Sequence, residues 1–274
     1  MGNGAAILET LLITRRKGSP IIAAGVGSGL TAKGAAAGGA DLLAVYNTAV
    51  YRVRGLPTAM AFLPYDDANQ LTRQAAPEVL ANAGDVPVLL GFGAHDPRVP
   101  VENLVQEVKS MGAAGVTNEP FLGLYSEDIQ AQLNANGLGF QRELALIRQA
   151  VLSGLLALAW TFTPEEAGLM AEAGAQIIGA VVGVTAGGAA GGSLSTARDQ
   201  AVMTIKNIAA SARSVREEII ILGHGGPLNS PEAVDDITNA AGADGYATGS
   251  TGERIPVVNG VAEAIQQYKA IRLI

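Results

Sequence analysis

The sequence predicts a single domain folded as a closed barrel of eight parallel strands, each followed by a helix: the (β/α)8 or TIM barrel. Eight short apolar runs alternate along the 274 residues with longer Ala-rich segments that carry charges at helical spacing. The runs are continuously apolar, as expected for parallel strands covered on both faces. A chain of this length fits one such barrel without a second domain.

A repeated phrase supports the closed barrel. Helical segments end in similar Gly- and Ala-rich sequences at 37–41, 111–116, 173–177 and 241–245, each directly before an apolar run. Glycine at such a place closes a helix in the left-handed conformation, so that the next strand begins at once. The same elements arranged as an open, doubly wound sheet are the rival architecture.

The elements are expected in a regular order. Residues 1–18 should form a helix that leads into the first strand, and no linker divides the remainder of residues 1–274. The strands are expected at 20–25, 41–46, 86–91, 115–118, 155–160, 177–182, 219–223 and 245–249. Thr163-Pro164-Glu165-Glu166 and Ser230-Pro231-Glu232 each place a capping hydroxyl before a proline and acids in the first turn, which predicts two helix starts.

The composition excludes several classes of protein. With no Cys, the chain has no disulfide scaffold, thiolate zinc site or cysteine nucleophile. A net charge of -7 with only 4% aromatic residues argues against nucleic acid as a partner and favours a small ligand. Charged residues make up 16%, against roughly 25% in average domains, and the helical segment 200–212 carries apolar residues beyond one face. Both observations favour a homo-oligomer, a dimer or a multiple of it.

No segment reads as a membrane anchor or a signal peptide. The longest uncharged stretch, 173–197, is filled with Gly, Ala, Thr and Ser rather than bulky apolar residues. The N-terminus places its basic residues after a short apolar run and lacks a cleavage site. We therefore expect a cytoplasmic protein without a membrane partner.

The carboxyl ends of the strands, where active sites of such barrels lie, carry the candidate catalytic residues. His224 follows the seventh strand on a tight turn and is expected to titrate near 6.5 as an acid/base, or to cap the strand through backbone bonds. His95 follows the third strand, beside an Asp-Pro pair that also commonly opens a helix. Glu119, alone among apolar neighbours, reads either as a general base or metal ligand, or as an ion-pair partner of Arg52 or Arg54.

An anion cradle is expected in the loops after strands seven and eight, the usual phosphate site of this architecture. Its members would be Gly225, Gly226, Ser250, Thr251 and Arg254, although closure of the barrel also accounts for the glycines. Further substrate-binding candidates at the strand ends are Gly25, Ser28, Tyr46, Asn47, Asn118 and Thr185. Mg²⁺, if used, would take oxygen ligands from Glu119, Asp96 or Glu253.

Several segments together resemble the phosphoenolpyruvate hydrolase-like family, also called the TIM-barrel signal transduction family. They are PIIAAGVGSGL at 20–30, GGADL at 38–42 with Tyr46-Asn47, LPY at 63–65, HGGP at 224–227 and GSTGERIP at 249–256. The resemblance covers nearly the whole chain and implies an oligomeric TIM barrel related to enzymes that handle phosphoenolpyruvate or phosphonopyruvate.

The leading hypothesis is a lyase or hydrolase acting on a small anionic keto or enol acid, because such chemistry needs an anion site, an acid/base and a group that polarises the enolate. The chain departs from the family after the sixth strand, where Val181 stands in place of an expected His. That substitution favours the alternative, a ligand sensor or interaction barrel without catalysis.

Overall fold

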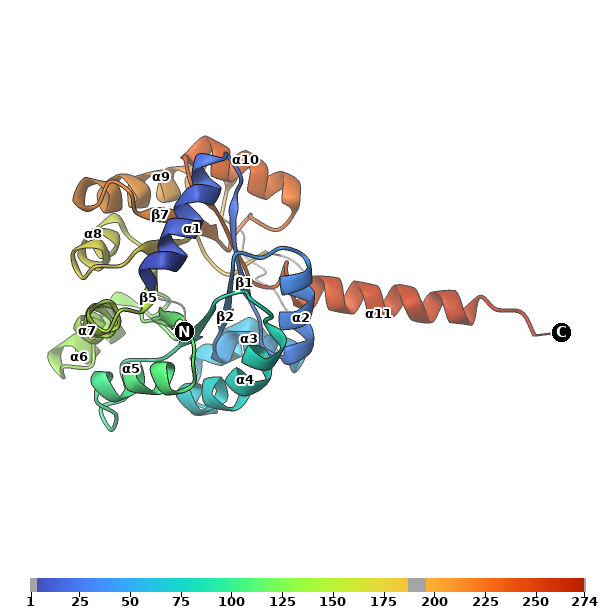
Figure 1. Cartoon of the computed structure of the whole chain (residues 1–274), viewed down its shortest axis with the longest axis horizontal. Helices are drawn as coiled ribbons and strands as arrows, with labels where there is room; N and C mark the ends of the chain where they lie inside the picture. The colour runs from blue at the N-terminus through green and yellow to red at the C-terminus, as the bar shows by residue number, and fades with distance from the viewer. Residues whose placement is uncertain (1–3, 187–195, 274) are drawn as a thin grey trace.

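The computed structural model, which describes residues 4–186 and 196–273, is a closed barrel with strand order β1-β2-β3-β4-β5-β6-β7-β8 (Figure 1). Neighbouring strands are parallel throughout, and β1 pairs with β8 to close the ring. The strands are β1 (Ile21–Gly25), β2 (Leu42–Val45), β3 (Val88–Gly91), β4 (Gly115–Thr117), β5 (Leu156–Thr161), β6 (Ile177–Val181), β7 (Ile220–His224) and β8 (Gly245–Thr248). The predicted fold class is confirmed, and each strand boundary lies within two residues of its predicted position.

The helices lie outside the ring of strands, except for the first. They are α1 (Gly4–Arg16), α2 (Gly29–Ala37), α3 (Asn47–Val53), the 3₁₀ helix η1 (Thr58–Phe62), α4 (Ala68–Asn82), α5 (Val101–Ser110), α6 (Glu127–Ala135), α7 (Phe140–Leu152), α8 (Pro164–Glu172), α9 (Arg198–Val215), α10 (Pro231–Ala241) and α11 (Arg254–Lys269). The expected N-terminal helix is α1, whose Ile7, Leu11 and Leu12 pack against the side chains that fill the barrel. This helix therefore covers the amino-terminal end of the strands and leaves the carboxyl end for the site.

The repeated Gly- and Ala-rich sequence closes each helix as predicted, through a glycine in the left-handed conformation. One glycine in each copy has a positive φ, between 68° and 99°, where a residue with a Cβ is strained. These glycines are Gly39, Gly112, Gly174 and Gly242. Each reverses the chain between a helix and the following strand.

The residue that enters the strand adds a bond to its neighbour in the ring. Asp41, Gln176 and Asp244 each accept a hydrogen bond of 2.8 Å from a backbone N–H at the start of the preceding strand. The phrase thus fixes the register of adjacent strands as well as ending the helix.

Both predicted helix starts are present. Thr163 caps α8 in a reciprocal capping box with Glu166, and the Ser230 side chain accepts the Ala233 N–H at the start of α10. These caps hold α8 and α10 in place against the barrel.

Two apolar layers stabilise the fold. The inner layer fills the barrel, and the outer layer lies between the strands and the helices. In α9, Ile205 and Ile208 are buried in the outer layer, so the interpretation of 200–212 as an oligomer surface is wrong for these two residues. Among the helices in the described ranges, none has the length and apolarity to cross a membrane.

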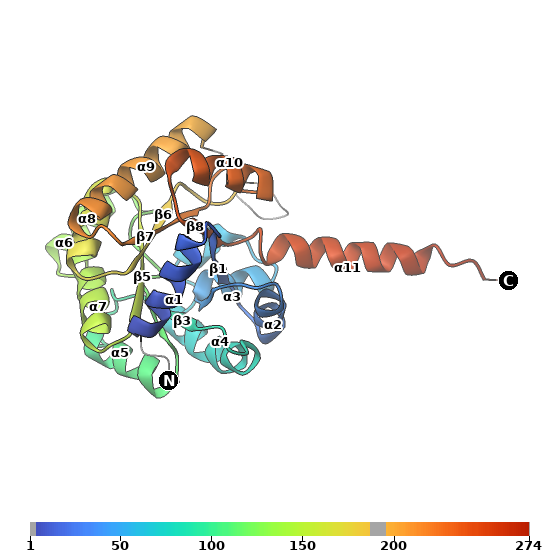
Figure 2. The ribbon, with the colours of Figure 1, turned by 45° about the horizontal axis from the view of Figure 1, so that its top comes forward.

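The last helix departs from the ring. Figures 1 and 2 show α11 leaving the barrel and extending into solvent, whereas the other helices lie against it. Arg254 is the only residue of α11 that is buried in the described structure.

Candidate active site

A small pocket lies at the carboxyl ends of the strands, on the face opposite α1. Its volume is about 30 Å³, the room of roughly one water molecule. Of the predicted site residues, those that line it are Tyr46, Glu119, Thr185, His224 and Ser250. Residues from strands distant in sequence thus meet where the barrel geometry predicts.

Arg52 is the charged centre of the pocket. This residue of α3 is only 4% exposed; its Nε donates to Glu253 Oε2 at 2.9 Å, and its Nη2 donates to Gly25 O at 3.1 Å. Burial opposes the charge of Arg52, but Tyr46 and Glu253 outweigh it and raise the pKa of the guanidinium. Arg52 therefore remains a buried cation in a largely apolar site.

Glu253 is held by the loop after β1 and by helices α2 and α3. Its Oε1 accepts the Gly27 N–H at 2.6 Å and the Thr31 hydroxyl at 2.8 Å, while Oε2 binds Arg52. These bonds use both oxygens, so Glu253 is a structural anchor of the site rather than a free ligand.

Gly25 makes room for the cation. A Cβ on Gly25 would lie 2.1 Å from the Tyr46 hydroxyl and 2.8 Å from Arg52 Nη2. The ring of Tyr46 lies beneath the guanidinium, 5.5 Å from centroid to Cζ, and burial raises the pKa of this tyrosine. Gly25 thus serves the site indirectly, by letting Tyr46 and Arg52 occupy one space.

Glu119 is a buried carboxyl without an ion-pair partner among the described residues. Burial raises its pKa to about 7, although the Thr48 hydroxyl and the Arg52 charge act in the opposite direction. The predicted alternative, an ion pair with Arg52, is not formed, because Arg52 pairs with Glu253. The Glu119-Pro120 peptide bond is cis. Near neutral pH this side chain can both donate and accept a proton.

His224 ends β7 with its ring in the pocket. Its Nδ1 lies 2.8 Å from Ala247 O, and because a carbonyl only accepts, Nδ1 carries the proton and Nε2 is an acceptor. Burial lowers its pKa to about 4, assisted by the charge of Arg52, so the expectation of an ordinary histidine pKa is wrong. At neutral pH the ring offers a lone pair to the pocket rather than a positive charge.

Aromatic rings form the apolar wall that removes water from these groups. Phe121 packs against Phe62 at 5.5 Å and against Phe162 at 4.9 Å between ring centroids. Trp160 lies 4.8 Å from the His224 ring. The wall accounts for the neutral states of Glu119 and His224, because burial disfavours the charged form of each.

His95 and Asn118 form a separate cluster around Glu143. The Asn118 amide donates to Glu143 and to Trp160 O, and its oxygen accepts the Trp160 N–H at 2.7 Å. His95 Nε2 lies 3.1 Å from Glu143 Oε1, and its Nδ1 lies 2.9 Å from Leu138 O. Asn118 therefore ties β4 to β5, and neither residue lines the pocket, contrary to their predicted roles.

The predicted cradle between the loops after β7 and β8 is not formed as expected. The Gly226 N–H donates to Gly183 O at 3.2 Å, and a Cβ on Gly225 would lie 1.9 Å from the same oxygen. These glycines pack the β7 loop against the β6 loop. In the β8 loop, Thr251 turns outward to the Tyr246 hydroxyl at 2.8 Å, while Ser250 lines the pocket.

Three other predicted binding residues lie behind the pocket. Arg254 is buried and donates from Nη2 to Leu56 O and to Thr58 Oγ1; within the described structure, its Nε and Nη1 have no hydrogen-bond partner. The Ser28 hydroxyl caps α2, and the Asn47 amide donates to Ala61 O at 2.8 Å. Arg254 thus adds positive charge beside Arg52, whereas Ser28 and Asn47 position the backbone.

The candidate magnesium ligands are not brought together. Asp96 binds Arg98 on the surface side of its loop, Glu253 is fully bonded, and only Glu119 lines the pocket. In residues 4–186 and 196–273, no group of three His, Cys, Asp or Glu side chains could hold a metal ion. The donor set does not fit a magnesium ion held by the protein alone.

Comparisons with known proteins agree with the fold. The profile of the phosphoenolpyruvate hydrolase-like family matches residues 6–271. The ToMV susceptible protein tm-1(GCR26) of tomato, Solanum lycopersicum, is 37% identical over 268 residues. That alignment covers 97% of this chain and 36% of the tomato protein, so the chain spans about a third of the length of this relative.

Solved structures share the architecture at low identity. Phosphonopyruvate hydrolase in complex with oxalate and Mg²⁺ superposes with a TM-score of 0.63 at 15% identity, covering 97% of this chain and 89% of that one. 2,3-Dimethylmalate lyase, a member of the PEP mutase/isocitrate lyase superfamily, gives 0.61 at 16% identity, covering 98% and 88%. Oxaloacetate acetylhydrolase gives 0.59 at 17% identity, covering 98% and 86%. With a profile match over nearly its full length, the chain belongs to the phosphoenolpyruvate hydrolase-like family.

Proposed function

We propose that this protein is a lyase or hydrolase that cleaves a bond next to the carbonyl of a small anionic keto or enol acid. One observation carries the proposal: the buried side chains around the pocket carry an excess of positive charge, beside a carboxyl that is neutral at mildly acidic pH. The structural neighbours named for phosphonopyruvate, oxaloacetate and dimethylmalate support the same substrate class.

The charge excess follows from the ion pairs. Arg52 and Arg254 are both buried, and their charges act on one another. Glu253 is the buried carboxylate that neutralises Arg52, and Glu119 is uncharged below pH 7. One positive charge is therefore left over in a site of low polarity, where an anion is bound more strongly than in water.

The neutral groups have complementary roles in this proposal. Cleavage next to a carbonyl leaves the bonding electron pair on carbon as an enolate, which then takes up a proton. The other fragment becomes a carbonyl compound by losing its hydroxyl proton, or is captured by water that loses one, and this proton restores the acid form of Glu119. Glu119, with a pKa of about 7, delivers that proton in the forward direction and removes it in the reverse. Arg52 stabilises the enolate oxygen, and His224 Nε2 accepts a hydrogen bond from a substrate hydroxyl or a water molecule.

A substrate of this class needs more room than the pocket has. The loop residues over it include Thr58 and Phe62 of η1 and Leu124 of the β4 loop. The Tyr125 hydroxyl donates to Phe62 O at 2.6 Å and joins the two loops. Binding therefore separates these loops.

The test measures binding and turnover with one steric variant. A Cβ on Gly249 would lie 3.2 Å from His224 Cε1, 3.7 Å from Thr185 Oγ1 and 3.8 Å from Arg52 Nη1, in the middle of the site. We expect Gly249→Ala to weaken oxalate binding at least tenfold, about 1.4 kcal/mol, by calorimetry without unfolding the chain. Gly34→Ala, with nothing near its added methyl group, is the control.

Turnover is followed by NMR on phosphonopyruvate, phosphoenolpyruvate, oxaloacetate and 2,3-dimethylmalate. Cleavage of one of them, lost in Gly249→Ala and kept in Gly34→Ala, supports the proposal. Oxalate binding that is equal in the two variants and the unmodified chain contradicts the assigned site.

A sensor without catalysis is the second candidate, favoured by Val181. This residue pairs with His224 across β6 and β7 and lines the pocket with an apolar side chain where the family resemblance predicts a His. Oxalate binding that Gly249→Ala abolishes, with no turnover of any of the four acids, supports the sensor.

A further inference from the structure

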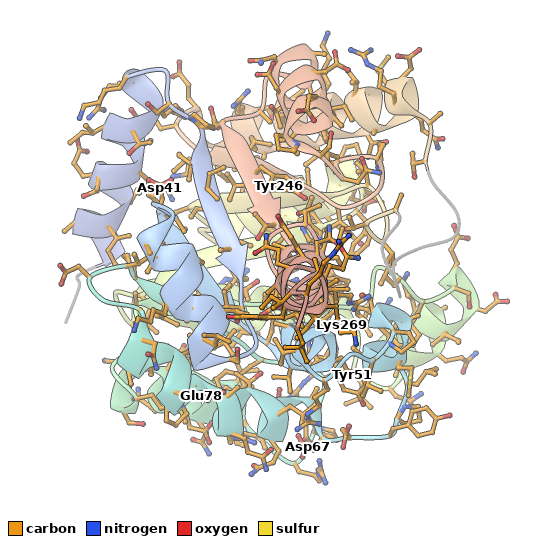
Figure 3. The ribbon with its side chains drawn as sticks, turned by 90° about the vertical axis from the view of Figure 1, so that its right-hand side faces the viewer. Asp41, Tyr51, Asp67, Glu78, Tyr246 and Lys269 are labelled. Atoms are coloured by element: carbon orange, nitrogen blue, oxygen red, sulfur yellow. The ribbon has the colours of Figure 1, made fainter. Side chains whose placement is uncertain are left out.

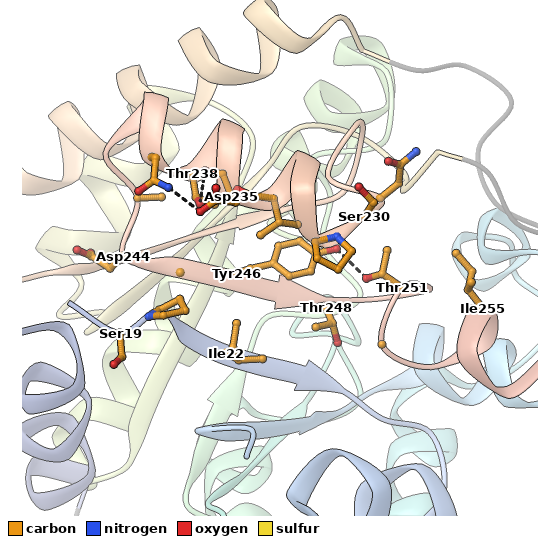
Figure 4. Close-up of a pocket in the computed structure, with 18 of the residues that line it drawn as sticks. Ser19, Ile22, Ser230, Asp235, Thr238, Asp244, Tyr246, Thr248, Thr251 and Ile255 are labelled. Carbon is orange, nitrogen blue, oxygen red and sulfur yellow. Dashed lines mark hydrogen bonds between the residues drawn. The ribbon is translucent and has the colours of Figure 1, made fainter. Parts of the chain in front are cut away.

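Two buried carboxylates hold the central side chains of the pocket, from opposite sides of the ring of strands. On the side of β8 and β1, a groove of about 1000 Å³ lies open along the outside of the barrel (Figure 4). The helix α11, seen along its axis in Figure 3, points away from it. Glu253, on this side, anchors Arg52. On the side of β4 and β5, Glu143 of α7 has the corresponding place beside Glu119.

Glu143 holds both ends of one short segment. Its side chain is 2% exposed. One oxygen, Oε2, accepts a hydrogen bond from the Asn118 amide, and the other, Oε1, accepts the Leu122 N–H at 3.0 Å. Asn118 and Leu122 are the first and last residues of the segment 118–122, which contains Glu119. One carboxylate from α7 thus spans the segment that carries the acid of the pocket.

The two ends of the segment are fixed in different ways. At the first end, the Asn118 amide donates to Trp160 O at 3.2 Å, and its oxygen accepts the Trp160 N–H at 2.7 Å. These bonds tie Asn118 to β5 as well as to α7. At the far end, the bond from Leu122 joins the backbone of a loop to Glu143. Losing the bonds of Glu143 would therefore loosen the segment while β4 stays paired in the barrel.

The segment carries a titratable side chain and part of the wall that keeps water from it. Glu119 is 4% exposed and Phe121 is 6% exposed, and both line the pocket. The ring of Phe121 lies 6.5 Å from Trp160 and 4.9 Å from Phe162, between ring centroids. Burial raises the pKa of Glu119. A displaced segment would admit water to the carboxyl and remove part of this effect.

The charged groups around Glu143 do not replace its two bonds to the segment. His95 Nε2, from the β3 loop, lies 3.1 Å from Glu143 Oε1 but has no hydrogen-bond partner among the described residues. Glu166 of α8 is close enough for the two carboxylates to act on one another. Arg142, the preceding residue of α7, donates to backbone carbonyls of the β3 loop instead. The segment is therefore held by hydrogen bonds to Glu143 rather than by the histidine.

We propose that Glu143 is the positioning residue of the pocket, whose bonds to Asn118 and Leu122 hold Glu119 where a substrate reaches its carboxyl and bulk water does not. For turnover, this inference rests on the proposed function, because Glu143 acts through Glu119. For the state of the Glu119 carboxyl it does not, because hydration of that side chain follows from the position of the segment alone.

The test compares Glu143→Gln with His95→Gln. The new amide in Glu143→Gln keeps the shape of the carboxylate, but its NH₂ group cannot accept a hydrogen bond, so one bond to the segment is lost. His95→Gln leaves both bonds in place. Carbon-13 NMR of the side-chain carboxyl groups gives the pKa of Glu119, whose signal is identified by its loss in Glu119→Gln. We expect a pKa of about 7 in the unmodified chain and in His95→Gln, and a fall toward the ordinary value of 4.5 in Glu143→Gln.

The other groups that face Glu119 are the same in both variants. They are the Tyr46 and Thr48 hydroxyls and the Arg52 guanidinium, which lie on the side of β2 and α3. A difference between the variants therefore reports the position of the segment 118–122. A folded Glu143→Gln whose Glu119 keeps a pKa of about 7 would overturn the inference.

Hydrogen exchange in the unmodified chain gives a second measure that does not depend on the folding of a variant. The Leu122 N–H, bonded to a buried carboxylate, should exchange about a hundredfold or more slowly than in an unstructured peptide. Exchange of the Leu122 amide at the rate of an unstructured peptide would show that Glu143 does not hold the segment, and would also overturn the inference.

Turnover separates this inference from the proposed function. In the proposed reaction the protonated Glu119 carboxyl acts, so the rate falls as pH rises through its pKa, and this fall should occur at lower pH in Glu143→Gln. Oxalate binding should stay unchanged, because Arg52 is held by Glu253. A midpoint at the same pH as in the unmodified chain would contradict the positioning role. If the unmodified chain cleaves none of the four acids, the proposed function fails and the NMR result decides the inference.

Discussion

Burial moves the two titratable groups of the pocket toward their neutral forms. It raises the pKa of Glu119 to about 7 and lowers that of His224 to about 4. At neutral pH the pocket then contains a carboxyl that exchanges its proton readily and an imidazole that does not. In the proposed reaction, Glu119 therefore transfers the proton, and His224 orients the group that accepts or gives it.

The substitution His224→Gln should lower turnover of the true substrate about a hundredfold while leaving the fold intact, because the acceptor that positions the reacting group is displaced. The Gln amide can still donate to Ala247 O, but it cannot place a ring nitrogen against Trp160. Steady-state kinetics and circular dichroism measure the two effects. His95→Gln is the matched control and should keep its activity, because His95 does not line the pocket. If His95→Gln alone abolishes turnover, the chemistry belongs to the Glu143 cluster.

Glu119 should make the protein less stable as pH rises. Its folded pKa of about 7 lies above the ordinary value of 4.5, so between these values the unfolded chain has lost the proton that the folded chain keeps. Relative to low pH, where Glu119 is protonated in both states, this difference lowers the free energy of unfolding by about 3 kcal/mol at pH 8 and by about 1 kcal/mol at pH 5. Glu119→Gln should remove it.

Urea unfolding at the two pH values tests this prediction. Glu119→Gln should gain more stability over the unmodified chain at pH 8 than at pH 5, while Glu127→Gln on the exposed surface of α6 should gain none. An equal gain at both pH values would show that Glu119 is charged in the folded protein at pH 8 and pH 5 alike.

The sequence placed Glu119 and His224 at the site but not Arg52. Each of the first two ends or directly follows a strand, so the barrel rule finds it. Arg52 lies within α3 and acquires its role from Glu253, 201 residues later, a pairing that no local pattern indicates. Asn118 and Thr251 also follow strands, yet their side chains turn away from the pocket, and the sequence alone does not say to which side a residue after a strand points.

At the scale of elements, apolar runs and glycine-closed helices were enough to locate the eight strands. Both signals are local and occur once per βα unit, so small errors do not accumulate along the chain. The loops were harder, because their contacts are between units: Gly226 packs on Gly183, and Tyr125 reaches η1. The direction of α11 was also not predictable, since the same amphipathic pattern suits its own barrel and that of a neighbour.

The hydrogen bond between Tyr125 of the β4 loop and Phe62 of η1 should control access to the pocket. Tyr125→Phe removes the bond to Phe62 O, worth about 1 kcal/mol, so the closed loops should open more often and oxalate should associate about fivefold faster. The single Trp160, which contacts both Phe121 and His224, reports binding by stopped-flow fluorescence. Tyr65→Phe, 70% exposed, is the control. An unchanged rate in Tyr125→Phe would show that another segment limits access.

At the scale of the whole molecule, the barrel keeps its two ends separate. The side chains of α1 pack into the amino-terminal end, and the titratable pocket lies at the carboxyl end. Chemistry can therefore vary at one end without disturbing the core at the other. On the side of the barrel, α11 extends away from the strands and leaves the groove between β8 and β1 uncovered by the helix that follows β8.

The position of Glu253 links that groove to the site. Glu253, which binds Arg52, directly precedes the first residue of α11, so whatever holds the start of the helix also holds the cation. A change in the direction of α11 should therefore shift the Arg52 guanidinium, and with it the affinity of the pocket for an anion.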